Sequence, residues 1–357
     1  MAEFAIIILP TMAKVILRDF WLMATIKEVA QRAGVSIRTV SRVLNDHPHV
    51  ANATRERVLS VIEELDFRPN AAARYMRTGQ SGLIGFLTDE VAQNVFSYDL
   101  IIGAQQAAWE HEKLLFLLNT GNDSQVEMRA LNMMRDHQVE GIIYATMYHR
   151  EIKRSQFPED IPAILVNCFA DDRSLPSIVP DEIGGGRLAT ETLLKNGRRR
   201  IGFVNVAAKE PAPLGRLEGY RQALANYGIP FDEGLVRYIE EPFEGLATST
   251  YDCVLSLLQM SDPPTGIFCF NDLMALGAYD AIRKSNLRIP EDVAIVGFDN
   301  VEILAAQIHP PLTTIELPLF EMGQLAIRML LGEVDITQDG QPVQHIIECP
   351  LIVRGSV

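Results

Sequence analysis

Apolar residues recur at helical spacing in three short groups near the start of the chain, and they predict three helices within residues 25–65. The groups are Ile26, Val29, Ala30 and Ala33, then Val40, Val43 and Leu44, then Val58, Val61, Ile62 and Leu65. In the second group the positions between the apolar residues face outward, and they include Arg38 and Arg42. The segment therefore has one buried side and one charged side.

Local signals mark where these helices begin and end. Thr25 and Glu28 have the spacing of a capping box at the start of the first helix. Gly34 suits the left-handed position just past its end, and Ser36 is placed to cap the second helix. Two short helices joined by a glycine-containing turn form the helix-turn-helix pattern, whose second helix enters the major groove of DNA. A small helical bundle with a charged surface is the alternative.

From Gly82 onward, short apolar runs alternate with helical patterns. The predicted strands are Leu83–Leu87, Leu114–Leu118, Gly141–Ala145, Ala163–Val166, Ile201–Val206, Gly266–Phe270 and Val293–Val296. The predicted helices are Asp99–Glu112, Gln125–His137, Gly186–Lys195, Leu214–Tyr227, Ser249–Leu258 and Asp272–Lys284. This alternation is typical of parallel sheets covered on both faces. Because so many strands exceed one compact sheet, we expect an α/β body of two similar lobes with a ligand cleft between them.

Charge separates the two parts of the chain. The whole chain of 357 residues carries −14, but residues 24–79 hold nine Lys/Arg and six Asp/Glu, a net of +3, while residues 80–357 carry −17. A basic head attracts phosphate, and an acidic body repels it. We therefore expect the head to bind DNA with a strong dependence on salt.

Metal, cofactor and catalytic motifs are not evident in the sequence. The four cysteines lack CxxC spacing, and the seven histidines lack metal-ligand spacing. Gly184-Gly185-Gly186 opens a predicted helix without the spacing of a dinucleotide fingerprint, so close helix packing explains it better. We expect no cofactor, no metal and no enzymatic activity.

The first 22 residues are expected to be a disordered or non-native extension. Their apolar run, Ile6–Leu9, is far too short to span a bilayer, and no Lys or Arg precedes it. Met23 lies two residues before the first capping residue, Thr25, and we expect it to be the true start.

The head resembles that of the lactose/galactose repressor family (LacI/GalR). The resemblance rests on residues 25–45, Thr54-Arg55-Glu56 and residues 68–73, which read Arg-Pro-Asn-Ala-Ala-Ala. It continues through the body to about residue 355. The matching body segments are Gly215–Tyr220, Asn271–Gly277, Ile289–Val293, Val296–Asp299 and Pro310–Thr314. The family's body resembles periplasmic binding proteins, so the implied fold is a small helical head joined to a two-lobed body of that kind.

For the head, the resemblance implies DNA contacts on the helix-turn-helix and on a following hinge helix. The implied residues are Thr25, Ser36, Ile37, Arg38, Thr39, Ser41, Arg42, Asn45, Asn70, Ala73, Met76 and Arg77. Arg38 and Arg42 would read guanine, and Ile37 a thymine methyl. Met76 would wedge between base pairs and bend the duplex. Ile37, Met76 and Ala51 depart from the family's usual residues, and Ala51 lacks the side chain that would cap the third helix.

For the body, the resemblance implies an effector site in the cleft. The implied residues are Arg216, Asn271 and Asp299. We also expect apolar walls for a ligand ring from Phe96, Phe243 and Phe298, and a further polar group from Asp89 at the end of the first strand. Arg216 would fork to two ligand oxygens, and Asp299 and Asn271 would bind hydroxyls. Simpler interpretations stay open: Arg216 and Asp299 would then pair with each other, and Phe298 would belong to the core. We expect Asp272 to be the cap of its helix.

The expected domains are residues 1–22 (extension), 23–68 (helix-turn-helix), 69–80 (hinge helix and linker) and 81–357 (body). Lobe 1 is expected over about 81–180 and 312–335, and lobe 2 over about 181–309 and 340–357. The chain would cross between lobes near 179–182, 310–312 and 335–343. Three crossings allow hinging without separation.

These features predict a transcriptional regulator that represses from a pseudo-palindromic operator under the control of a small molecule. Sugars and purines both suit a cleft with Arg and Asp, and the family resemblance favours a sugar. We expect a homodimer, since no leucine heptad follows the last apolar strand, and a cytoplasmic, nucleoid-associated protein. The alternatives are a sugar-binding protein and a sugar-processing enzyme that share the two-lobed fold. The first would need an export signal, and the second an acid/base pair or a metal.

Overall fold

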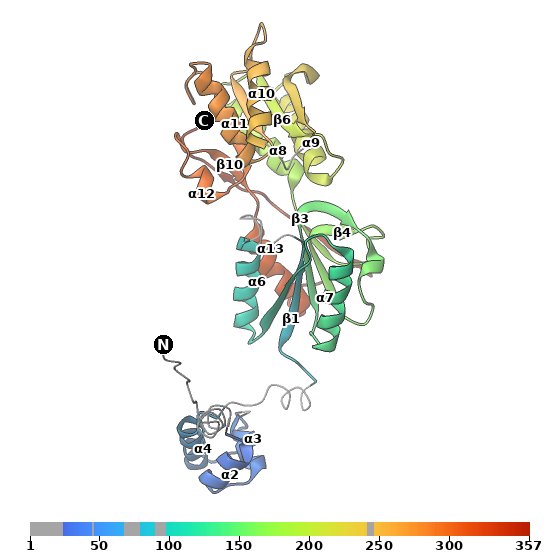
Figure 1. Cartoon of the computed structure of the whole chain (residues 1–357), viewed down its shortest axis with the longest axis vertical. Helices are drawn as coiled ribbons and strands as arrows, with labels where there is room; N and C mark the ends of the chain where they lie inside the picture. Colours follow the sequence, from blue (N-terminus) through green and yellow to red (C-terminus); the bar gives the residue numbers. More distant parts are fainter. Residues whose placement is uncertain (1–23, 45, 68–78, 90–97, 241–245) are drawn as a thin grey trace, which may run out of the picture. The chain divides into compact units, whose positions relative to one another are not determined.

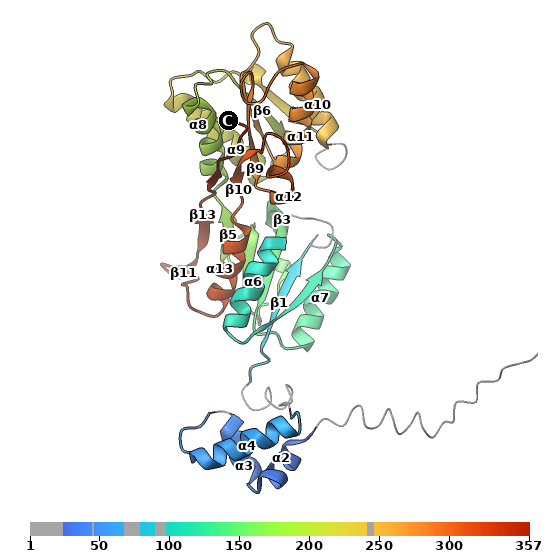
Figure 2. The ribbon, with the colours of Figure 1, turned by 90° about the vertical axis from the view of Figure 1, so that its left-hand side faces the viewer.

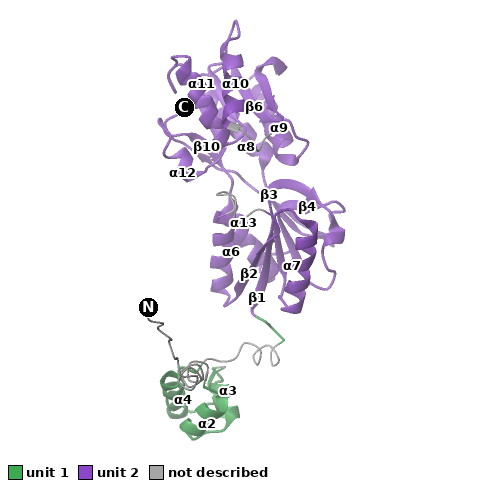
Figure 3. Ribbon diagram, in the orientation of Figure 1, with its two compact units in different colours: residues 1–81 green, residues 82–357 purple. Residues whose placement is uncertain are grey.

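The computed structural model contains two compact units, residues 1–81 and 82–357 (Figure 3). It describes residues 24–44, 46–67, 79–89, 98–240 and 246–357. Among these residues, no helix combines the length and the apolar character needed to cross a membrane.

The N-terminal unit contains the three predicted helices, α2 (Ile26–Ala33), α3 (Ile37–Leu44) and α4 (Asn52–Glu64). The capping box at Thr25 and Glu28 is present, and Gly34 ends α2 with φ 64°. Ser36 Oγ accepts a hydrogen bond from the backbone N of Thr39, which caps α3. The local signals in the sequence therefore specify these helix ends.

Valines from all three helices form the core of this unit. Val29, Val40 and Val58 are fully buried, and Val61 is 8% exposed. As expected, Ala51 precedes α4 without a side-chain cap. Burial against α2 and α3 holds α4 in place despite this uncapped start.

The body contains two six-stranded sheets, one in each lobe (Figures 1 and 2). The lobe 1 sheet has the order β13-β5-β4-β3-β1-β2, and the lobe 2 sheet β14-β10-β9-β8-β6-β7. The lobe 1 strands are β1 (Leu83–Thr88), β2 (Leu114–Asn119), β3 (Ile142–Ile152), β4 (Ala163–Ala170), β5 (Ser177–Pro180) and β13 (Gln344–Ile347). The lobe 2 strands are β6 (Ile201–Val206), β7 (Val236–Ile239), β8 (Gly266–Cys269), β9 (Ala294–Asp299), β10 (Thr313–Glu316) and β14 (Leu351–Ile352). All seven predicted strands are present, and β5, β7, β10, β13 and β14 are additional.

Helices cover both faces of each sheet. In lobe 1, α6 (Tyr98–Glu110) and α13 (Leu319–Leu330) pack on one face and α7 (Ser124–Asp136) on the other. In lobe 2, α8 (Glu182–Lys195) and α9 (Pro211–Asn226) cover one face, and α10 (Leu246–Leu258) and α11 (Asp272–Lys284) the other. The remaining short elements are η3 (Arg154–Gln156), η4 (Glu233–Leu235), α12 (Glu302–Ala305) and the hairpin β11–β12 (Thr337–Gln338 and Gln341–Pro342). The fold predicted from alternating strands and helices is confirmed.

Two of the three crossings between lobes lie elsewhere than expected. The first runs from β5 to α8, within the predicted 179–182. The second lies between β10 and α13, not at 310–312, because β10 pairs with β9 in the lobe 2 sheet. The third lies between β13 and β14, not at 335–343, because β13 pairs with β5 in the lobe 1 sheet. The polar stretch near 335–343 forms the β11–β12 hairpin instead.

Candidate functional site

Arg216, on α9, lies at the centre of a buried polar cluster in lobe 2. Its Nε donates to Glu182 Oε2 at 2.8 Å and its NH1 to the Phe270 carbonyl at 2.5 Å. Its NH2 lies 3.5 Å from Asp299 Oδ1. The guanidinium is 3.5 Å from the ring centroid of Phe298 and 4.3 Å from that of Phe270. We call these five residues the Arg216 cluster.

Two glycines at the start of α8, Gly185 and Gly186, allow the cluster to form. A Cβ on Gly185 would lie 2.7 Å from the Phe298 ring, and one on Gly186 would lie 2.5 Å from the Arg216 carbonyl oxygen. α8 therefore approaches Phe298 and α9 more closely than any larger residue would allow. Gly184-Gly185-Gly186 serves close packing, as the sequence indicated.

Asp299 has an unfavourable conformation. It is the last residue of β9 and has φ 102°, in a region that L-residues other than glycine rarely adopt. Burial raises the pKa of its carboxyl well above the ordinary value, and Arg216 acts in the opposite direction. Such strain is concentrated at functional sites. Asp299 also follows a strand end, where α/β folds bind ligands.

The capping role expected of Asp272 belongs to its neighbour. Asn271 is the N-cap of α11, and its Oδ1 accepts from the Met274 backbone N at 2.9 Å. Asp272 is buried and accepts from Thr314 Oγ1 at 2.6 Å and from the Val301 backbone N at 2.8 Å. Burial raises the pKa of Asp272 to about 7, although both hydrogen bonds oppose the shift. Asp272 therefore ties α11 to two neighbouring segments.

Lobe 1 brings His149, on β3, to the Arg216 cluster. Nδ1 of His149 lies 3.6 Å from Oε1 of Glu182, and both side chains are buried. Burial alone would raise the pKa of Glu182, but Arg216 and His149 outweigh it and the pKa is lowered. The contact joins lobe 1 to lobe 2.

Asp89 lies at the end of β1, in an ion pair within lobe 1. Its Oδ2 is 3.1 Å from the Arg150 guanidinium, and its Oδ1 accepts from the Met147 backbone N at 3.0 Å. The same Arg150 donates to Asn122. Asp89 thus joins β1 to the end of β3, and it is 2% exposed.

The structure brings together some of the predicted effector residues. Arg216, Asp299 and Phe298 are in one cluster, and the pairing of Arg216 with Asp299 that the sequence left open is present. Phe298 is fully buried beneath Arg216, so it is a core residue and not an open wall. The predicted residues Phe96 and Phe243 lie outside the described residues.

Sequence reasoning missed Glu182, His149 and Phe270. Glu182 begins a helix, where an acidic residue is ordinary and signals no site. His149 lies within an irregular stretch in the pairing of β3 with β4, between Ala145 and Arg150, which no local pattern indicates. Phe270 follows β8 directly and lies beside Asn271, which was the only available signal.

On the head, α3 presents the predicted base readers. Arg38 and Arg42 are exposed, and Ile37 is 44% exposed although it is apolar. Thr25, Ser36 and Thr39 make helix-capping hydrogen bonds, and Ser41 on α3 is partly exposed. The remaining predicted DNA contacts lie outside the described residues: Asn45, Asn70, Ala73, Met76 and Arg77.

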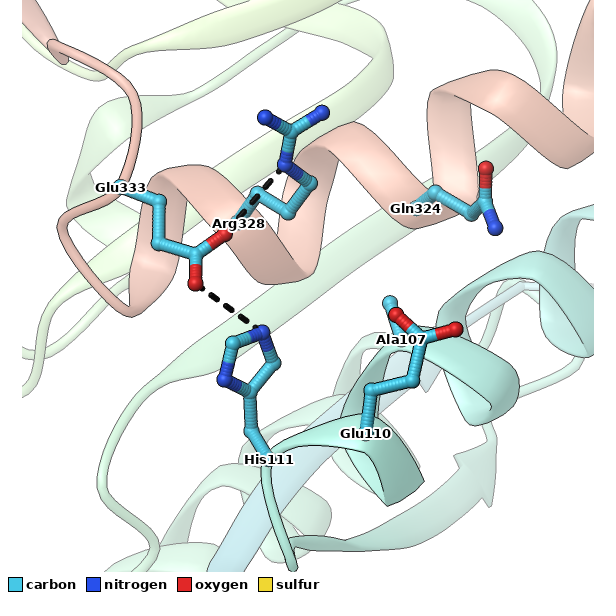
Figure 4. Close-up of a pocket in the computed structure, with 6 residues that line it drawn as sticks. All are labelled: Ala107, Glu110, His111, Gln324, Arg328 and Glu333. Atoms are coloured by element: carbon cyan, nitrogen blue, oxygen red, sulfur yellow. Dashed lines mark hydrogen bonds and ion pairs between the residues drawn. The ribbon is translucent and has the colours of Figure 1, made fainter.

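A separate pocket lies in lobe 1 between the C-terminal end of α6 and α13 (Figure 4). Its charged groups bind one another, because Glu333 is 3.2 Å from His111 and 3.3 Å from Arg328. Since α6 runs antiparallel to the strands it connects, this pocket is at the amino ends of the strands. It is therefore distinct from the cleft that the strand ends predict.

Comparison with known proteins assigns both units to protein families. Residues 25–70 match the model of "Bacterial regulatory proteins, lacI family", and residues 81–354 match "Periplasmic binding proteins and sugar binding domain of LacI family". The chain is 34% identical to the HTH-type transcriptional repressor PurR of Aliivibrio salmonicida, over 94% of this chain and 99% of that repressor. It is 32% identical to the ribose operon repressor of Haemophilus influenzae, over 94% and 99%.

Solved structures agree with this. A Lac repressor dimer bound to operator and the anti-inducer ONPF superposes with a TM-score of 0.74 at 26% identity, over 94% of this chain and 99% of that one. A complex of the transcriptional regulator CelR with cellobiose superposes with a TM-score of 0.64 at 28% identity, over 94% and 100%. The chain belongs to the lacI family of bacterial regulatory proteins, and it is a DNA-binding transcriptional regulator controlled by a small-molecule effector.

Proposed function

We propose that the effector is a hydroxyl-rich small molecule, a sugar, that binds between the lobes at the Arg216 cluster. The observation that carries this is the carboxyl of Asp299, held on strained backbone at the end of β9 and beside Arg216. A sugar hydroxyl donates to such a carboxyl and accepts from a guanidinium. Asn271, the N-cap of α11 just after β8, supplies a further polar group. Phe298 packs against the Arg216 guanidinium from inside lobe 2. Asp89, at the end of β1, is the proposed polar group of lobe 1.

The proposed operator is a pseudo-palindrome read by a homodimer. The α3 helices would enter successive major grooves, where Arg38 and Arg42 contact guanine and Ile37 contacts a thymine methyl. The exposure of Ile37 supports this, because an exposed apolar side chain on a DNA-reading helix needs an apolar partner. The resemblance to a repressor dimer on its operator supports the stoichiometry.

Regulation would couple the cleft to the head. An effector that binds two lobe arrangements unequally shifts their populations, and the spacing of the two heads changes with them. The segment 69–80, proposed as a hinge helix, lies mostly outside the described residues. The protein would act in the cytoplasm by binding alone, without turning over its ligand.

A thermal-shift screen of the full chain against sugars and nucleobases tests the effector class, because a specific ligand raises the melting temperature by mass action. A sugar should stabilise the chain. Stabilisation by nucleobases alone would contradict the sugar proposal. Removal of residues 1–79 should abolish operator binding and leave ligand binding intact, and retained operator binding would contradict the assignment of the head.

A further inference from the structure

The charges of the Arg216 cluster are balanced before any ligand enters. Arg216 is 3% exposed and is bound to Glu182, which is 5% exposed, through a hydrogen bond of 2.8 Å. The contact with Asp299 is looser, at 3.5 Å. Arg216 therefore forms a close pair with one carboxylate and a loose contact with a second.

We propose that Glu182 sets the charge class of the effector: by holding Arg216, it makes the cleft accept an uncharged, hydroxyl-rich molecule and reject analogues that carry a carboxylate or a phosphate. The inference rests on the proposed effector site. The residue that would select uncharged over anionic effectors is thus the first residue of α8, which no sequence pattern identifies as functional.

An anionic ligand would need Arg216 as its partner. It would have to displace Glu182, and it would leave a buried carboxylate without its cation, which is strongly unfavourable. The alternative, an anion beside an intact pair of Arg216 and Glu182, adds an unpaired charge to a buried site. Both routes penalise a negative charge.

A hydroxyl meets neither penalty. It can donate to Asp299 at the looser contact, while Glu182 keeps its hydrogen bond to Arg216. Burial raises the pKa of Asp299, which disfavours the charged form of its carboxyl and favours hydrogen bonds to neutral groups.

Glu182 is also enclosed from lobe 1. His149 approaches its second carboxylate oxygen to 3.6 Å, and the edge of the His149 ring packs at 89° against Phe169, with centroids 5.8 Å apart. Arg216 on one side and His149 on the other thus surround the carboxylate. A movement of Glu182 to make room for an anion would break its hydrogen bond to Arg216 and its contact with His149.

The test compares the wild-type chain with Glu182→Gln and with a control, Glu191→Gln. Glu191 lies on the same helix and pairs with Lys195 on its surface, so the control removes the same charge outside the cluster. Affinities are measured by calorimetry and thermal shift for matched pairs: D-glucose and D-glucuronate, D-galactose and D-galacturonate, D-ribose and D-ribose 5-phosphate.

In the wild type and in Glu191→Gln, only uncharged members should bind. In Glu182→Gln, the affinity for the anionic sugar of a pair should rise at least tenfold relative to the affinity for its neutral partner. If the wild type binds an anionic sugar as tightly as its neutral partner, the inference is overturned, whatever the variants do. An unchanged ratio in a folded Glu182→Gln also overturns it.

Inorganic phosphate, as a second probe, tests the role of Glu182 independently of whether the effector is a sugar. If no sugar binds any variant, the sugar proposal fails, and inorganic phosphate decides the role of Glu182. Phosphate should raise the melting temperature of Glu182→Gln above that of the wild type and Glu191→Gln. Equal responses of all three proteins to phosphate would overturn the inference.

Discussion

Nδ1 of His149 in lobe 1 lies 3.6 Å from Oε1 of Glu182 in lobe 2. Glu182 also binds Arg216, so this contact joins lobe 1 to the charged centre of the Arg216 cluster. Neither ring nitrogen of His149 has a hydrogen-bond partner among the described residues. Relative motion of the lobes must therefore change the surroundings of Glu182, and through Glu182 those of Arg216.

Replacing His149 by phenylalanine removes the polar contact and keeps an aromatic ring against Phe169. We expect the chain to stay folded, because the ring packing on Phe169 is kept and neither nitrogen of His149 makes a hydrogen bond to another described residue. The ratio of operator affinities with and without effector should change about fivefold or more, since the contact favours one lobe arrangement. Fluorescence anisotropy on operator DNA measures this ratio.

The control is His137→Phe, because His137 packs on Phe116 in lobe 1 at 74° and 5.3 Å between centroids. This variant should retain the wild-type ratio. If His149→Phe also retains it, the interlobe contact has no part in regulation.

Asp272 should give the body a pH-dependent stability. Its pKa is raised from 3.8 to about 7 by burial, so its contribution is fully present below about pH 4 and is lost as the pH rises through 7. The melting temperature should therefore fall between about pH 4 and 7 and level off above pH 7. The asparagine in Asp272→Asn cannot ionise, so the melting temperature of this variant should fall less with rising pH. Part of the fall should remain, because the pKa of Asp299 is also raised.

Differential scanning calorimetry across this pH range measures the slope. The matched control is Asp280→Asn, which removes an exposed carboxylate from the same helix and should keep the wild-type slope. A wild-type slope in Asp272→Asn would show that this carboxyl does not titrate with folding.

The uncapped start of α4 offers a gain in stability. Ala51→Ser supplies a hydroxyl at the N-cap, and we expect it to stabilise the head by about 1 kcal/mol. Slower hydrogen exchange of the α4 amides in the full chain would measure this gain. The control is Ala53→Ser, at the second residue of α4. It provides no N-cap and should not slow the exchange of the α4 amides. Equal rates in Ala51→Ser and the wild type would contradict the capping argument.

Local patterns predicted much of this fold because they act over a few residues. The bounds of β6 and α11 agree with the predicted Ile201–Val206 and Asp272–Lys284, since apolar runs and caps are encoded nearby. Strand β5 was not recognised because its four residues give too short a pattern. The crossings were displaced for a related reason: β10 and β13 are short strands whose sheet is decided by distant partners.

The candidate site was predictable only where family resemblance marked the residues. Arg216 and Asp299 were identified in this way and do meet in the cluster. Asn271 and Asp272 are both capable caps, and the choice depends on Thr314, 42 residues away, which binds Asp272. Glu182 and His149 meet across the lobes, and no spacing along the chain encodes that contact.

The central claim is that the cleft controls the head, and reciprocal binding tests it most directly. Operator DNA is first selected from a random pool, and its affinity for the full chain is measured with and without a ligand that stabilises the chain. We expect a change of about 5- to 150-fold in operator affinity, and an equal change in ligand affinity when operator is bound. Operator affinity that is the same with and without the saturating ligand would contradict the account.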